Sequence, residues 1–73
     1  MIIIIILENG SSVRFCGGDV STDITESGVY INGMLDKYEL EFYPLLLSGN
    51  IKRMSRNEIL FPKENIKSFH IFW

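Results

Sequence analysis

Five basic side chains in residues 50–73 have the types and spacing best suited to a chemical role. Lysine and arginine hold phosphate groups through charge-assisted hydrogen bonds, and aromatic rings beside such cations can stack on unpaired bases. Tyr43, Phe69, His70 and Trp73 are the rings that could join them. The pattern predicts a patch for single-stranded nucleic acid, or a site at an oligomer interface for a small anionic ligand such as a nucleotide. The basic residues are Lys52, Arg53, Arg56, Lys63 and Lys67.

The charge balance favours a simpler interpretation of these cations. The formal net charge of the chain is −2, with the acidic residues concentrated in residues 1–49. An acidic chain has no general attraction for a polyanion, and solvated strand faces account for scattered basic residues. The acidic stretch around Glu39, Glu41 and Tyr43 is instead a candidate face for contact with another protein.

No residue pair in the sequence suggests catalysis. His70 is the single histidine and Cys16 the single cysteine, and neither has a partner at a spacing known for acid–base or nucleophilic chemistry. Cys16 is expected to be a small buried residue. Asp19, Asp23 and Glu26 supply oxygen ligands, but their spacing matches no calcium-binding loop. We therefore expect no enzyme activity, no metal and no cofactor.

Length and composition indicate one small domain spanning residues 1–73. The chain is 47% hydrophobic, which is ample for a core. One cysteine excludes an internal disulfide, which suits a reducing cytoplasm. The apolar run in residues 2–7 is too short for a membrane span and lacks the basic flank of a signal peptide. A chain of this size would also suit a phage or another mobile element.

The five consecutive isoleucines of residues 2–6 predict a strand that is apolar on both faces, because successive side chains of a strand point in opposite directions. Residues 69–73 are apolar on both faces in the same way. One face can line the core, and the other needs an apolar neighbour from outside. We expect a homo-oligomer whose interface contains Ile3, Ile5, Phe69, Ile71 and Trp73.

The remaining pattern predicts an all-β fold. Asn9-Gly10 marks a tight hairpin turn, and further strands are expected at residues 12–16, 29–31, 38–43, 51–54, 58–61 and 66–73. Residues 20–25 are expected to form either a short edge strand or an ordered loop. Apolar residues show no long helical periodicity, although residues 45–47 could form one helical turn. We expect a small, partly closed antiparallel barrel of five to six strands, which resembles SH3-like and Sm-like barrels in outline alone.

The function expected from these features is that of a small non-enzymatic cytoplasmic binding module. It would act through protein–protein contacts, as an adaptor or an inhibitor does, and would self-associate. The alternatives are a nucleic-acid-binding barrel that uses the basic residues, and a protein that sequesters a small anionic ligand.

Overall fold

The isoleucine run forms the central strand of a three-stranded sheet. The computed structural model describes residues 1–73 and orders this sheet β2-β1-β7, with β1 at Ile2–Leu7, β2 at Ser12–Cys16 and β7 at Ile66–Phe72. All neighbouring strands are antiparallel. The β-branched side chains suit this position because they pack well on a pleated surface. The predicted first hairpin is thus confirmed.

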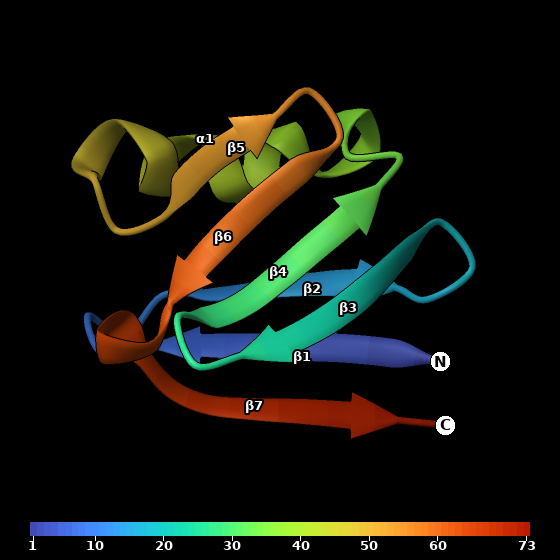
Figure 1. The fold of residues 1–73 in the computed structure, drawn as a ribbon, viewed down its shortest axis with the longest axis horizontal. Helices are drawn as coiled ribbons and strands as arrows, with labels where there is room; N and C mark the ends of the chain where they lie inside the picture. Colours follow the sequence, from blue (N-terminus) through green and yellow to red (C-terminus); the bar gives the residue numbers. More distant parts are fainter.

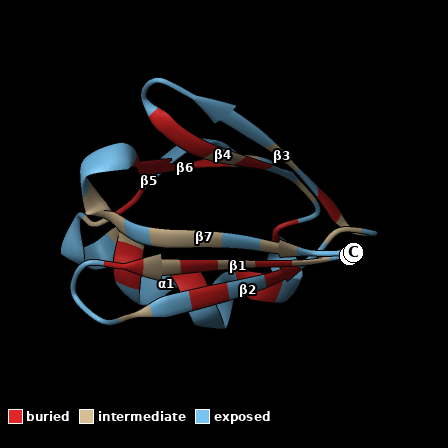
Figure 2. Ribbon diagram, turned by 90° about the horizontal axis from the view of Figure 1, so that it is seen from below, coloured by how far each residue is buried: buried red, intermediate tan, exposed pale blue.

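Four further strands form a second antiparallel sheet in the order β3-β4-β6-β5. They span Val20–Thr25 (β3), Gly28–Gly33 (β4), Lys52–Ser55 (β5) and Glu58–Pro62 (β6). The two sheets face each other as layers (Figures 1 and 2). A 3₁₀ turn, η2 (Lys63–Asn65), carries the chain from one sheet to the other. Of the two alternatives expected for residues 20–25, an edge strand and an ordered loop, the structure has the edge strand, β3.

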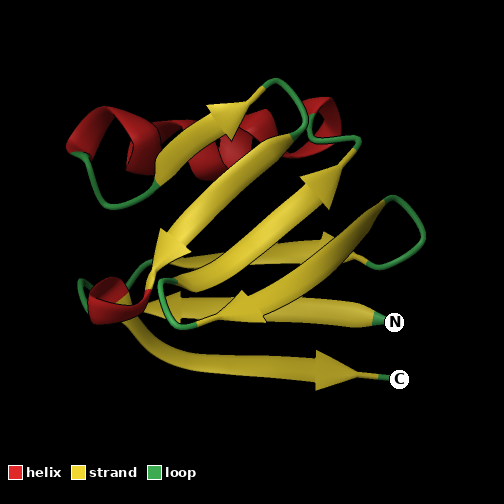
Figure 3. Ribbon diagram, in the orientation of Figure 1, coloured by secondary structure: helices red, strands yellow, loops and turns green.

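The fold is mostly β, but neither sheet closes into the expected barrel. The structure has seven strands and also a helical segment, made of η1 (Asp36–Tyr38) and α1 (Glu39–Ser48) (Figure 3). Each sheet keeps two outer strands, β2 and β7 in one and β3 and β5 in the other. Closure would require these outer strands to pair. The chain therefore has four strand edges to protect.

The helix replaces the strand that was predicted for residues 38–43. Its buried side chains are Tyr38, Phe42 and Leu45, and the spacing from 38 to 42 to 45 places them on one face of a helix. Leu40, Tyr43 and Leu47 are exposed on the other face. Because apolar residues occur on both faces, the helical period is weak and the alternation at residues 38–43 imitates a strand.

The core is formed by the facing sides of both sheets and the inner side of the helix. Fifteen buried residues make one cluster. Phe15 lies at its centre, with its ring 5.0 Å from that of Tyr38 and 6.1 Å from that of Phe61. Both contacts are edge-to-face, a geometry that aromatic pairs prefer. No helix has the length and hydropathy that crossing a membrane requires.

The expectation that Ile3 and Ile5 face outward is wrong. Both are fully buried in the core of their own chain, because they pair with Phe15 and Val13 of β2. Residues opposite each other on antiparallel strands share a face of the sheet. The outward side chains of β1 are therefore those of residues 2, 4 and 6, which are half-buried.

Candidate interaction surface

The outer face of the three-stranded sheet is an apolar column with a mixed border. Ile2, Ile4 and Ile6 form the column along β1. Cys16 and Phe72 flank Ile2, Arg14 and His70 flank Ile4, and Ser12 and Ser68 flank Ile6. Five of these six border residues are exposed, and the sixth, Ser68, is half-buried. No other element covers this face, so its apolar column is open to contact.

Phe72 extends the apolar column at the end of β7, and Trp73 follows it at the end of the chain. The side chains of Phe72 and Trp73 are 55% and 95% exposed. The Phe72 ring stacks on the His70 ring, with centroids 6.2 Å apart. Of the five predicted interface residues, Trp73 is freely exposed, Phe69 and Ile71 are half-buried on the inner side of β7, and Ile3 and Ile5 are in the core.

The edge of β2 is protected by the helical segment. The Cys16 backbone N–H donates a hydrogen bond to the Tyr38 hydroxyl at 3.1 Å, and the Arg14 N–H donates to a Glu41 carboxylate oxygen at 3.3 Å. These are N–H groups that an outer strand would otherwise offer to another chain. The segment thus closes the side of the sandwich where β2 lies.

The same helix also reaches β5, the outer strand of the other sheet. Arg53 of β5 forms an ion pair with Glu39 at 3.6 Å, and its guanidinium lies 5.5 Å from the centroid of the Phe42 ring. The strand is short and has an irregular register near Met54. Short, bulged and charged outer strands resist pairing with other chains.

The opposite side of the sandwich, between β3 and β7, is open. Ile24 of β3 pairs with the buried Val29 of β4 and so shares its core-facing side, yet Ile24 is 63% exposed. A pocket of about 340 Å³ opens at this side and is lined by Ile24, Val29, Ile66 and Lys63 among others. We call this opening the mouth of the sandwich.

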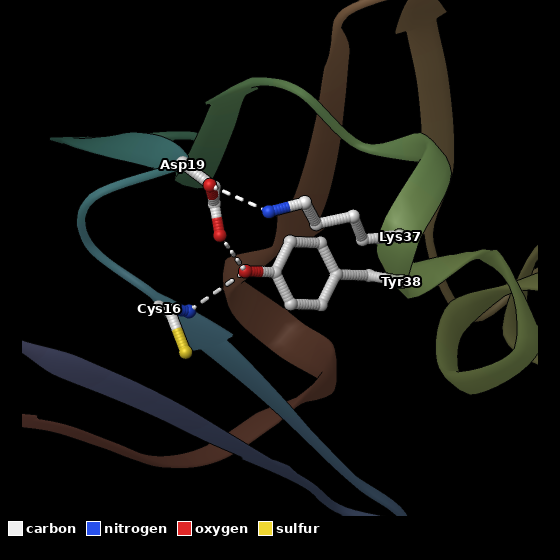
Figure 4. A network of polar contacts seen from close by, with 4 residues as sticks. All are labelled: Cys16, Asp19, Lys37 and Tyr38. Atoms are coloured by element: carbon white, nitrogen blue, oxygen red, sulfur yellow. Dashed lines mark hydrogen bonds and ion pairs between the residues drawn. The ribbon is translucent and has the colours of Figure 1, made fainter.

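A polar network joins the turn after β2 to the helical segment (Figure 4). The Tyr38 hydroxyl donates to Asp19 Oδ2 at 3.0 Å, and Lys37 Nζ lies 2.9 Å from Asp19 Oδ1. The hydrogen bonds from Lys37 and then Tyr38 lower the pKa of Asp19. The hydrogen bond and charge of Asp19 raise the pKa of Lys37, and burial is the largest cause that raises the pKa of Tyr38. These shifts favour the ionised forms of Asp19 and Lys37 and the un-ionised hydroxyl of Tyr38, which are the forms present at neutral pH. The network therefore has a structural role.

The five basic residues are spread over β5, the turn after it, η2 and β7. Lys52, Arg53 and Arg56 lie on β5 and the turn that follows it, before β6 begins, whereas Lys63 and Lys67 come after β6 ends. Arg53 is already engaged with Glu39 and also donates to the Arg56 carbonyl at 2.9 Å. Lys52 and Arg53 pair with Leu60 and Ile59 of β6, Arg56 lies in the turn before β6, and Lys63 and Lys67 follow its end.

The acidic residues proposed as a protein-contact face lie on the helix and not on a strand. Glu39 forms an ion pair with Arg53, and Glu41 accepts a hydrogen bond from the Arg14 backbone N–H. Tyr43 is exposed on the outer side of α1. No three His, Cys, Asp or Glu side chains come together as a metal site.

The position expected for Cys16 is wrong, because its side chain is exposed. It pairs with Ile2 and therefore lies on the outer face of the sheet. Sequence reasoning also missed Ile24, whose alternation with Thr22 and Val20 marks the inner face of an edge strand.

Comparison of the chain with protein-family models, curated proteins and solved structures finds no match.

Proposed function

We propose that this protein is a non-enzymatic binding module that acts through protein–protein contacts, including contacts between its own copies. The observation that carries the proposal is the uncovered apolar surface on the outer face of the three-stranded sheet, made of Ile2, Ile4, Ile6 and Phe72. Contiguous exposed apolar surface with a polar border is typical of protein interfaces.

The mixed border supports this role. Arg14 and His70 flank Ile4, and arginine and aromatic residues are enriched where proteins meet. The small core provides a second argument. A chain of 73 residues buries only about 60% of its unfolded surface, so association adds stability that the monomer lacks.

Sedimentation equilibrium over a wide range of protein concentration tests the proposal. We expect the wild-type chain to sediment as more than a monomer at high concentration. Ile4→Lys places a charge in the middle of the apolar column and should weaken association by at least about tenfold. Leu47→Lys is the matched control, because Leu47 is 73% exposed on the helix and lies away from this sheet face.

Circular dichroism of both variants shows whether each chain is folded before association is compared. Equal weakening by Ile4→Lys and Leu47→Lys would contradict the assigned surface. A wild-type chain that stays monomeric at every concentration, and binds no protein through this face, would overturn the proposed function.

A further inference from the structure

The outer edge of β7 carries backbone groups that no other element meets. Antiparallel strands direct the N–H and C=O of alternate residues to one neighbour. Leu7 N–H donates to the Ser11 carbonyl and Gly17 N–H to that of Met1, so the odd residues of β1 bond to β2. The even residues of β1 consequently face β7, at Ser68, His70 and Phe72. The backbone groups of Phe69 and Ile71 point to the free edge.

This edge is the least protected of the four, because its irregular register and Lys67 lie only at its start. The helix covers β2 and contacts β5, and β3 is polar, with four Ser, Thr or Asp residues among its six. In contrast, β7 is seven residues long and carries Phe69, Ile71 and Phe72. A long apolar edge strand readily pairs with another chain. A copy of the same strand is a suitable occupant, since an antiparallel pair of identical strands is symmetric.

Antiparallel pairing of two β7 strands would also bring together two features of the open side. The end of one strand comes to lie beside the start of the other, so the partner copy's Trp73 approaches Ile66. Trp73 continues the alternation of the inner residues Phe69 and Ile71. Ile66 lines the mouth of the sandwich, together with Ile24. An exposed indole and an open apolar pocket are thus placed next to each other.

We propose that two copies of this chain join at the open side, with β7 paired to β7 and each Trp73 seated in the mouth of the other sandwich. The paired strands would continue the sheet from three strands to six. Lys63, which lines the mouth, gives the indole ring a cation at its border. This inference rests on the proposed function and adds a contact between copies at the edge of β7, separate from the contact expected on the outer face around Ile4.

A dimer at this side needs more surface than the paired strand edge alone. A stable interface buries about 800 Å² on each partner, which is about a sixth of the 4580 Å² exposed by one copy. The edge of one strand is too narrow to supply this area. The side chains of Phe72 and Trp73 and the mouth with Ile24 extend it on both sides of the paired edge.

A proline substitution tests the strand pairing. Ile71→Pro removes an N–H that points away from β1, so the β1–β7 ladder is kept while the free edge loses a donor. Ile71→Ala is the matched control, since it shortens the same side chain and retains the N–H. We expect Ile71→Pro to weaken dimerisation by at least about tenfold more than Ile71→Ala does. Equal dimerisation of the two folded variants would overturn the paired-strand arrangement.

Trp73 is the single tryptophan, so its fluorescence reports on the mouth directly. We expect its emission to shift to shorter wavelength as protein concentration rises, in step with sedimentation. Ile24→Asp should abolish the shift and weaken the dimer. Met34→Asp is the matched control, because Met34 is 65% exposed and lies outside the mouth. The control should leave both the shift and the dimer unchanged.

The outcomes separate this inference from the proposed function. If the dimer is lost in Ile4→Lys but forms normally in Ile24→Asp and Ile71→Pro, the proposed binding module stands and the open-side arrangement is overturned. A chain that never associates would overturn both. A dimer that is weakened by Ile24→Asp and Ile71→Pro and not by Met34→Asp supports the arrangement.

Discussion

At the scale of single residues, Tyr38 has the most consequential contacts in the structure. Its ring packs on Phe15, and its hydroxyl accepts from the Cys16 N–H and donates to Asp19. A single side chain therefore contributes to the core, covers the edge of β2 and anchors the turn that leads to β3. The hydroxyl contributes to stability because it accepts the hydrogen bond of the Cys16 backbone N–H.

Tyr38→Phe should lower the free energy of unfolding by about 1–2 kcal/mol, because it leaves the Cys16 N–H and an Asp19 oxygen without their partner. Urea denaturation measures the loss. Tyr43→Phe is the control, since Tyr43 lies on the same helix with its side chain 52% exposed. Equal stability of the two variants would show that the Tyr38 hydroxyl contributes nothing.

Asp19 makes part of the stability depend on pH. Its pKa is lowered from the ordinary value of 3.8 by the hydrogen bonds from Lys37 and Tyr38. A lowered pKa stabilises the folded chain above the unfolded value, and this stabilisation is lost as the pH falls through the folded value. The acid side of the stability curve should therefore drop below about pH 4.

Asp19→Asn should flatten this acid drop, because asparagine does not titrate and still accepts a hydrogen bond from Tyr38. Urea midpoints measured from neutral pH to about pH 2 check the result. Asp36→Asn is the control, as Asp36 is exposed on η1. An acid drop in Asp19→Asn as steep as in the wild-type chain would assign the effect to other carboxylates.

At the scale of elements, the helix shows why local patterns can mislead. Pro44 lies in the interior of α1, where its ring removes an N–H that would bond the carbonyl of Leu40. The helix forms because Tyr38, Phe42 and Leu45 are buried together, and tertiary packing provides most of a helix's stability. A proline at this position argues against a helix in the sequence, and packing overrides it.

Pro44→Ala should raise the free energy of unfolding by about 1–3 kcal/mol, since it restores the missing donor and removes the clash with the preceding turn. Thermal and urea unfolding measure the gain. Leu47→Ala changes an exposed residue on the same helix and should stay within about 0.5 kcal/mol of wild type. A destabilised Pro44→Ala would contradict a continuous helix through residue 44.

The first hairpin shows how far the sequence predicts an element. Asn9-Gly10 and the isoleucines correctly place both strands, but the inward face depends on one residue of register. A two-residue turn at Asn9-Gly10 would pair Ile4 with Phe15. The actual loop is longer, as Leu7 bonds to Ser11, and Ile3 pairs with Phe15. Because both faces of β1 carry isoleucine, composition alone cannot identify the buried face.

At the scale of the whole molecule, the two sides of the sandwich differ. The helix bridges the sheets at β2 and β5, whereas no helix lies along the side formed by β3 and β7 (Figure 1). The sequence shows the apolar character of both terminal strands. It cannot show how the elements that carry the basic residues are arranged, or that Ile24 and Ile66 line one pocket, because these relations depend on how the two sheets are stacked.

An open sandwich that is completed by a second copy should be more stable at higher concentration. If folding and dimerisation are linked, the unfolding midpoint rises with protein concentration by mass action. For two chains of this length, the expected rise is about 5 °C for each tenfold increase in concentration. Differential scanning calorimetry over a wide concentration range measures it.

Trp73→Ala provides the comparison that assigns this rise to the open side. Trp73 is 95% exposed, so its removal should leave the melting of the dilute chain unchanged, because little packing within one copy is lost. At high concentration the variant should melt below the wild-type chain, since the dimer loses the side chain that fills the mouth. A wild-type midpoint that is independent of concentration would mean that the 73 residues fold without help from a partner copy, and that the open edge of β7 is tolerated in the monomer.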